Sequence, residues 1–171
     1  MIGLTCHPET PTTAVHGIRA RVARRRADVL EVSYALEGDL AKLVIPAPRP
    51  QRFAERLWQH SCCEIFVARS GESAYREFNF SPSGEWAAYA FSRYREGVPV
   101  RDDAINPAIA VRASARELRL DASVACAPGK LQLAISAVIE EADGARSYWA
   151  LRHAPGKPDF HHPDAFALEL D

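Results

Sequence analysis

The sequence predicts an all-β protein, a single antiparallel β-sandwich domain of jelly-roll type that spans residues 1–171. Three observations support this prediction. Apolar and polar residues alternate with a period of two along most segments, as in strands that bury one face. Turn-forming residues interrupt the chain often enough to give about eleven short strands, which is typical of sandwiches. The sequence has no convincing helical period of about 3.6 residues.

The first third of the chain is predicted to contain strands, a turn and a proline spacer. Alternation predicts strands over residues 14–23, 28–36 and 40–45. Residues 37–39 (Glu-Gly-Asp) have the composition of a turn between the second and third strands. The prolines at positions 46, 48 and 50 fix their own φ and restrict the residues before them. This stretch is therefore expected to be an extended spacer.

The middle of the chain is predicted to form a three-stranded meander over residues 59–69, 75–81 and 85–92. The two connections, Ser-Gly-Glu-Ser and Ser-Pro-Ser-Gly, contain residues that favour tight turns. Further strands are predicted over residues 109–113, 117–126, 131–139, 147–153 and 165–170. Residues 113–120 are also compatible with one helical turn.

The composition argues against nucleic-acid and membrane partners. The net charge is −1, so no strong electrostatic attraction to nucleic acid is expected, and Arg24–Arg26 is predicted to be a solvated edge. The sequence has no apolar run of about 18 residues, so no transmembrane helix is predicted. The N-terminus lacks a basic region followed by an apolar stretch, so we expect no secretory signal. The expected location is the cytoplasm, with the four cysteines reduced.

The first stretch with functional character contains Trp58, Glu64, Glu77 and Asn79. Strand alternation places Phe78 on one face and Glu77 and Asn79 on the other, and Glu64 is expected to share that second face. Carboxylates and an amide suit a hydroxyl-rich ligand, because they bond in the plane of a sugar ring while an indole covers its apolar face. The alternative is a solvated polar face with Trp58 sealing the core.

The second stretch is a proline-rich loop that contains Asp159, Phe160, His161 and His162. Three interpretations stay open. The loop presents Phe160 and a histidine to a ligand, or it is a surface loop without function, or it holds a metal. The metal site is the least favoured, because adjacent side chains diverge and no third histidine stands at helical spacing.

The sequence lacks the common catalytic motifs. G-x-S-x-G, the P-loop, G-x-G-x-x-G and H-E-x-x-H do not occur. Cys62 and Cys63 with His60 could act as nucleophile and base, but their position within a strand predicts buried, inert thiols. Glu64 and Glu77 could act as a glycosidase pair only with a suitable separation and a deep cleft. The sequence therefore favours binding over catalysis.

Three runs of sequence resemble those of a known group. They are L-W-x-H-x-C-x-E-x-F at residues 57–66, Y-x-E-F-N-F-S-P-S-G-E-W at residues 75–86 and G-K-P-D-F-H-H-P-D-x-F at residues 156–166. The chain resembles the bacterial DOMON-like proteins, which are related to the family 9 carbohydrate-binding modules. This resemblance implies a β-sandwich with a ligand pocket, in a superfamily whose members bind sugars or haem.

The resemblance also implies roles for particular residues. Trp58 and Glu64 are similar to the first aromatic and the carboxylate of the sugar-binding modules. Asn79 is similar to the amide of their Arg-x-Asn pair, whereas Glu77 stands at the arginine position and reverses its charge. The second aromatic of the sugar clamp has no tryptophan counterpart, since this chain offers residues 160–162 (Phe-His-His) there. A polar ligand other than a sugar is therefore also compatible with the resemblance.

The haem-binding relatives use a methionine with a histidine or a lysine as axial ligands. This chain has only Met1, so a haem here would need two histidines. The candidates for such ligands are His60, His153, His161 and His162.

The predicted function is a non-catalytic binding module for a sugar or another small polar ligand, without a cofactor. The alternatives are a hydrolase that uses carboxylates and histidine, and a haem- or metal-binding protein. The predicted ligand-binding residues are Trp58, Glu64, Glu77, Asn79, Asp159, Phe160, His161 and His162. The oligomeric state has no signal in the sequence.

Overall fold

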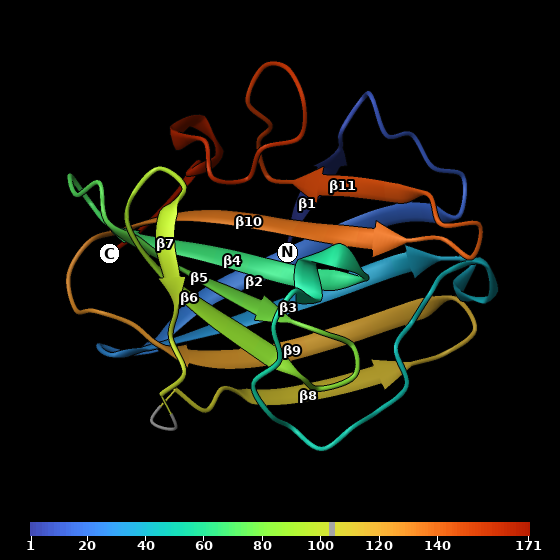
Figure 1. Ribbon diagram of the computed structural model, residues 1–171, viewed down its shortest axis with the longest axis horizontal. Coiled ribbons are helices and arrows are strands. Elements are labelled where there is room, and N and C mark those ends of the chain that lie inside the picture. Colours follow the sequence, from blue (N-terminus) through green and yellow to red (C-terminus); the bar gives the residue numbers. More distant parts are fainter. Residues whose placement is uncertain (103–104) are drawn as a thin grey trace.

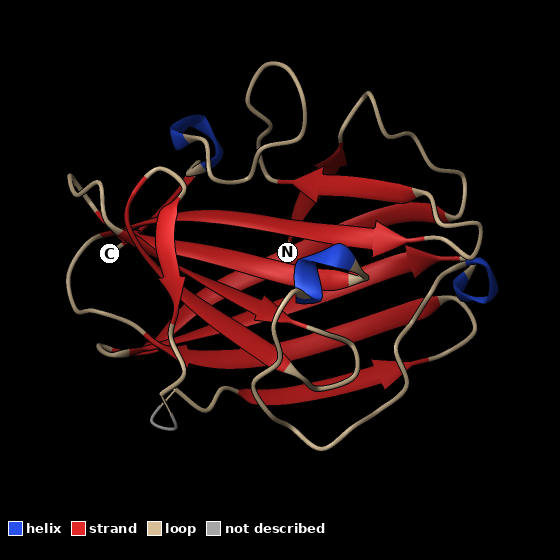
Figure 2. Cartoon of the chain, viewed as in Figure 1, coloured by secondary structure: helices blue, strands red, loops and turns tan. Residues whose placement is uncertain are grey.

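The strands form two packed antiparallel layers, as predicted. The computed structural model describes residues 1–102 and 105–171, and the strands follow one hydrogen-bonded path that folds over on itself (Figures 1 and 2). We name the layers the β3 sheet and the β4 sheet after their central strands. β1 (Ile2–Cys6) joins them, because its first residues pair with β2 and its last two pair with β11. Among the described residues, no helix is long and apolar enough to span a membrane.

The order of strands in each sheet follows from the pairing. The β3 sheet consists of β2 (Val15–Arg26), β3 (Val29–Gly38), β9 (Glu117–Ala125) and β8 (Ala108–Ala113), in that spatial order. The β4 sheet consists of β7 (Glu96–Pro99), β6 (Trp86–Arg93), β5 (Tyr75–Phe80), β4 (Cys62–Arg69), β10 (Leu131–Glu140) and β11 (Arg146–Ala150). A last short strand, β12 (Leu168–Leu170), pairs with the start of β10.

The core lies between the two sheets. Alternate residues of each strand point inward, for example Ile65 of β4, Phe78 of β5 and Leu133 of β10, and they meet Leu30 and Leu120 of the β3 sheet in one apolar cluster. Each of these side chains is almost completely buried. Burial of a side chain of this size contributes about 1.5–3 kcal/mol to stability.

The outer face of the β4 sheet is also covered over part of its area. A second apolar cluster there joins Phe66 of β4, Tyr75 of β5 and Ala134 of β10 to Phe160 of the C-terminal segment, residues 151–167. This segment, orange to red in Figure 1, runs along the edge of the sheet beyond β10 and β11. Strand β4 is therefore buried on both faces. Polar side chains that point to the outer face of the sheet are therefore buried in this covered area.

Several predicted elements were wrong in detail. The predicted strand over residues 40–45 is a 3₁₀ turn (η1, Leu40–Lys42) and an isolated bridge at Leu43, because the chain leaves the sheet toward Pro46, which has no N–H to donate. The predicted helical turn over residues 113–120 is instead the end of β8, a turn over residues 114–116 and the start of β9. In it Ser114 Oγ accepts hydrogen bonds from the backbone N–H groups of Arg116 and Glu117. Strands β1 and β7 were not predicted.

Candidate ligand-binding site

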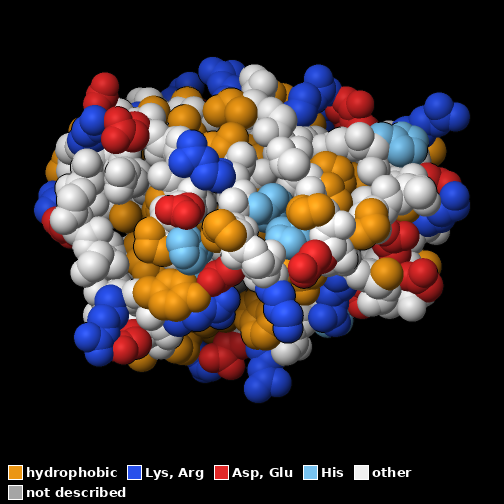
Figure 3. Space-filling view, turned by 90° about the horizontal axis from the view of Figure 1, so that it is seen from above, with side chains coloured by type: hydrophobic (Ala, Val, Ile, Leu, Met, Phe, Trp, Pro, Cys, Tyr) orange, Lys and Arg blue, Asp and Glu red, His pale blue; other side chains and the backbone are white. Residues whose placement is uncertain are grey.

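A cavity of about 350 Å³ opens on the outer face of the β4 sheet, and we call it the outer cavity. Its walls come from strands of the sheet, from the 3₁₀ turn η2 (Leu57–Gln59), from the β6–β7 turn and from the C-terminal segment. The lining residues are Trp58, Glu64, Glu77, Tyr89, Phe91, Arg95, Val138, Tyr148, Pro158, Phe160 and His161. Figure 3 views the molecule from the side of the C-terminal segment, where histidines and charged groups of both signs are interspersed with apolar side chains.

The pairing of β4 with β5 brings three buried polar side chains together. Glu64 pairs directly with Asn79, and Phe66 pairs with Glu77, so Glu64 and Glu77 are diagonal neighbours on one face. Glu64 is 2% exposed, Glu77 5% and Asn79 0%. The prediction that these residues share a face is confirmed. Burial of these polar side chains lowers the stability of the fold unless hydrogen bonds replace their lost hydration.

Glu77 is held by its neighbours on two sides. The amide Nδ2 of Asn79 donates to Glu77 Oε1 at 2.8 Å, and His161 Nε2 lies 3.7 Å from Glu77 Oε2. Burial raises the pKa of Glu77 to about 7, although the hydrogen bond from Asn79 and the nearby Arg95 charge both act to lower it. Glu77 therefore changes its charge near neutral pH.

Glu64 is less completely satisfied. Ser136 Oγ donates to Glu64 Oε2 at 3.4 Å, whereas Glu64 Oε1 has no hydrogen-bond partner among the described residues. Burial raises the pKa of Glu64 well above its ordinary value, and the charge of Glu77 raises it further. We call Glu64 and Glu77 the carboxyl pair. Two like charges this close in a buried place do not ionise independently, so the pair holds a proton at neutral pH.

His161 forms one wall above the carboxyl pair. Its Nδ1 lies 2.9 Å from the hydroxyl of Tyr75, and its ring packs edge-on against Phe66 with the centroids 5.1 Å apart. Burial lowers the pKa of His161 to about 4, so the ring is neutral at pH 7. The Tyr75 hydroxyl also accepts a hydrogen bond from the backbone N–H of Arg95, which leaves its own proton for His161 Nδ1. We therefore assign Nδ1 as the acceptor and place the hydrogen of the neutral imidazole on Nε2, which faces Glu77.

Asp159 ties the C-terminal segment to the β6–β7 turn. Its carboxylate accepts hydrogen bonds from the Tyr94 hydroxyl at 2.5 Å and from Arg95 Nη2 at 2.9 Å. It also accepts one from the backbone N–H of His161 at 3.1 Å. The pKa of Asp159 is lowered, because these hydrogen bonds and the Arg95 charge outweigh its partial burial. Asp159 thus positions Arg95 and His161, which line the cavity, without lining it itself.

Trp58 stands at the rim of the outer cavity. The preceding residue, Leu57, is buried with Cys62 and Ala87 in a small apolar cluster that anchors η2. The indole itself is 48% exposed, so Trp58 does not seal the core, which was the alternative interpretation. An exposed indole beside a cavity provides a flat apolar face for a ligand.

The structure brings some of the predicted site residues together and not others. Five of the eight line the outer cavity: Trp58, Glu64, Glu77, Phe160 and His161. Asn79 and Asp159 lie behind the lining and hold Glu77 and Arg95. His162 is not at the cavity, because its Nδ1 accepts the backbone N–H of Asp164 at the start of the 3₁₀ turn η3 (Pro163–Ala165).

Sequence reasoning missed several lining residues. Tyr89 and Phe91 lie on the same face of β6 as Glu77 on β5, because Glu77 pairs with Tyr89 and Tyr75 with Phe91. Counting the register across the predicted meander would have found them. Arg95 had no such signal, since it stands in the β6–β7 turn with φ of 57°. The turn closes over the sheet because Gly97 lies directly against the ring of Phe91, where a Cβ would collide.

Cys62 and Cys63 lie on opposite faces of β4, as predicted. Cys62 packs with Leu57, and Cys63 belongs to the core between the sheets. Burial raises the pKa of both thiols, so neither has the thiolate character that a nucleophile needs. His60 pairs with Glu140 at 2.7 Å. Within residues 1–102 and 105–171, no three His, Cys, Asp or Glu side chains form a group that could hold a metal ion.

The fold is shared with solved carbohydrate-binding proteins. A protein from Bacteroides uniformis that is proposed to bind carbohydrate has a TM-score of 0.68 and 13% identity, covering 96% of this chain and 82% of its own. A family 9 carbohydrate-binding module from Caldicellulosiruptor kristjanssonii, solved with glucose, has a TM-score of 0.57 and 12% identity, covering 93% and 77%. A structure of such a module from the same organism with cellotriose has a TM-score of 0.54 and 12% identity, covering 85% and 70%.

These similarities define the class of fold, a β-sandwich like that of the family 9 modules. No protein-family model and no curated protein matches the sequence.

Proposed function

We propose that this protein is a non-catalytic binding module and that the outer cavity holds a sugar or another small polar ligand. The observation that carries this proposal is the convergence of buried polar side chains on one aromatic-walled cavity. A sheet face that only had to be covered would be cheaper to cover with apolar residues, because each buried polar group loses its hydration. Here Glu64, Glu77 and His161 all face the cavity.

The cavity has the chemistry that a hydroxyl-rich ligand requires. The carboxyl pair provides acceptors at the floor, and the Nε2 hydrogen of the neutral His161 provides a donor. Trp58, Tyr89 and Tyr148 offer aromatic faces around the opening. A volume of about 350 Å³ lies within the range of small-molecule sites.

The comparisons support the same class of ligand. The modules with this fold were solved with glucose and cellotriose. Because the identity is only 12–13%, the fold supports the class of function, and the cavity itself supports the choice of residues.

The proposal can be tested by following the fluorescence of Trp58 during titration with a panel of monosaccharides and disaccharides. Trp58 is the exposed tryptophan, since Trp86 and Trp149 are 5% and 6% exposed. We expect at least one sugar to change the emission and Trp58→Ala to weaken its binding about tenfold by calorimetry, which corresponds to about 1.4 kcal/mol. Val98→Ala is the matched control, because Val98 is exposed on β7 and outside the cavity lining. A panel without any binding would overturn the proposal.

A hydrolase is the second candidate, and one observation favours it. The pKa of Glu77, raised to about 7, lies in the range of a general acid. Glycosidases place their two carboxyl groups on either side of the scissile bond, whereas Glu64 and Glu77 are neighbours on one sheet face at the floor of the cavity. The arrangement therefore suits binding better. Release of nitrophenol from nitrophenyl glycosides, abolished by Glu77→Gln, would establish the hydrolase instead.

A further inference from the structure

We infer that the ligand of the outer cavity carries a positively charged amino group, which the carboxyl pair receives, and that amino sugars are its chemical class. This inference rests on the proposed function, because it names the kind of ligand for the same cavity. It is drawn from the unpartnered acceptors at the floor, from the aromatic walls and from the arrangement of charges around them.

Two acceptors, one at the floor of the cavity and one just behind it, are not satisfied by the protein. Glu64 Oε1 and Asn79 Oδ1 are both buried and have no hydrogen-bond partner among the described residues. Both residues are almost completely inaccessible, and Glu64 also lines the cavity. A buried acceptor without a partner costs free energy, so its retention points to a donor that arrives with the ligand. An ammonium group brings three donors and no acceptor, which matches this floor.

The walls favour a cation in the same place. Tyr89, Phe91 and Tyr148 line the cavity beside the carboxyl pair, and Phe160 and Trp58 complete an aromatic surround. The face of an aromatic ring carries partial negative charge and attracts a cation within about 6 Å of its centre. Rings and carboxylates together are the means by which proteins bind organic ammonium groups.

Arg95, which lines the cavity, acts on Glu77 through its charge, but its guanidinium is bonded to other side chains. Arg95 Nη2 is bound to Asp159 at 2.9 Å, and Arg95 Nε is bound to the Tyr94 hydroxyl at 3.2 Å. Arg95 and Asp159 therefore form a neutral unit at the rim. His161 has lost its charge through burial, so it does not supply a cation either. The negative charge of the carboxyl pair is left for the ligand.

The charge state of the pair depends on the groups that face it. These are Tyr34 of β3, Cys62 and Cys63 of β4, Tyr75 and Asn79 of β5, Tyr89 of β6, Ser136 of β10, Arg95 of the β6–β7 turn and His161 of the C-terminal segment. Without a ligand, a proton on the pair removes part of the repulsion between the two carboxylates. The positive charge of an ammonium group would also reduce this repulsion, so its binding is expected to displace a proton from the pair.

The test compares three probes of similar shape by isothermal titration calorimetry at pH 7, namely glucosamine, glucose and N-acetylglucosamine. Glucosamine carries the amine, glucose has a hydroxyl at the same position, and the acetylated sugar has a neutral amide. We expect glucosamine to bind about tenfold more tightly than glucose, since a hydrogen bond to a charged group is worth about that factor. Titrations in buffers of different ionisation enthalpy should show net proton release on binding of glucosamine.

Two variants connect the preference to the carboxyl pair. Glu77→Gln keeps the shape of the side chain and removes its charge, so the ratio of the two affinities should fall to about one. Glu72→Gln is the matched control, because the Glu72 side chain is 51% exposed and pairs with Arg69 away from the outer cavity, so the ratio should stay unchanged. A thermal melt of each variant confirms that it is folded.

The outcomes separate this inference from the proposed function. Equal affinities for glucosamine and glucose in the unmodified protein would overturn the amine inference while the proposed function stands. A preference for glucosamine that survives Glu77→Gln would also overturn it, because the selectivity would then arise elsewhere. Failure of all three probes and of the wider sugar panel would overturn the proposed function, and this inference with it.

Discussion

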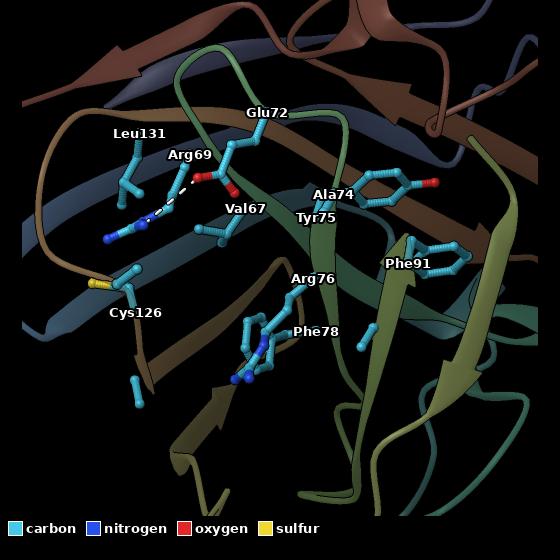
Figure 4. A pocket seen from close by; sticks show the side chains of 13 residues that line it. Val67, Arg69, Glu72, Ala74, Tyr75, Arg76, Phe78, Phe91, Cys126 and Leu131 are labelled. Carbon is cyan, nitrogen blue, oxygen red and sulfur yellow. Dashed lines mark ion pairs between the residues drawn. The ribbon is translucent and has the colours of Figure 1, made fainter. Parts of the chain in front are cut away.

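Two cavities of similar size in the described part of the molecule differ in what their walls contain. The outer cavity has about 350 Å³ and lies on the covered face of the β4 sheet. The second has about 450 Å³ and lies at one end of the sandwich, between the β4–β5 turn and the β9–β10 connection, and we call it the end cavity (Figure 4). The larger cavity is not the better candidate for a ligand.

The end cavity lies at the margin of the core between the sheets and is lined in part by core residues. Val67, Phe78 and Leu131 line it and also belong to the cluster between the sheets. Its charged lining residues are Arg76 and the ion pair of Arg69 with Glu72, which is drawn as a dashed line in Figure 4. Both side chains of the pair are half exposed. The outer cavity instead contains carboxyl groups whose pKa values are raised by burial. Buried polar groups that lack partners identify a site better than volume does.

The largest expected effect tests whether the end cavity belongs to the core. Phe78→Ala removes a buried ring from the core side of β5 and enlarges the end cavity, so the free energy of unfolding should fall by about 3–5 kcal/mol. Urea unfolding measures this change. The neighbouring Glu77→Gln, on the opposite face of the same strand, should not destabilise the protein, because it removes a buried charge. A small loss for Phe78→Ala would mean that the end cavity is a surface feature.

The second prediction is that the stability of the protein depends on pH through titrating groups of the outer cavity. The folded pKa values of Glu64 and Glu77 are raised above the ordinary 4.5, so the folded protein binds more protons than the unfolded chain and loses stability as pH rises. His161, whose pKa is lowered, acts oppositely as pH falls below about 6.5. Between pH 6 and pH 8 the carboxyl pair dominates, and unfolding free energy should fall by about 1–3 kcal/mol.

Urea unfolding at several pH values measures this trend, and the double variant Glu64→Gln/Glu77→Gln provides the control. With both carboxyl groups replaced by amides, the fall between pH 6 and pH 8 should disappear. A fall that persists in the double variant would assign the pH dependence to groups outside the outer cavity.

The fold and the floor of the site follow from local pattern. The period of two in the sequence assigns Ile65 and Phe78 to one face and Glu64 and Glu77 to the other, and the structure has this arrangement. Alternation is a property of each strand, so it does not depend on distant parts of the chain. The sequence of β4 also has apolar residues on both faces of the strand, which indicates that its outer face is covered.

The walls of the site depend on contacts between distant segments, and the sequence pattern did not contain them. Asp159 selects which histidine faces the cavity, because it accepts the backbone N–H of His161 and binds Arg95 from a turn 64 residues earlier. Adjacent histidines look alike in a sequence, and only this tertiary contact separates His161 from His162. The short strands β1 and β7 were missed because neither has a row of apolar residues long enough to show a period.

The smallest expected effect concerns the ion pair at the end cavity. Arg69→Ala removes a pair whose two side chains are each 51% exposed, and exposed pairs of this kind contribute about 0–1 kcal/mol. We therefore expect a change in unfolding free energy below about 0.5 kcal/mol and no change in the affinity for any sugar bound by the outer cavity. Urea unfolding and calorimetry on one preparation measure both. If Arg69→Ala weakened sugar binding as strongly as Trp58→Ala, the end cavity would be the binding site and the contrast between the two cavities would be reversed.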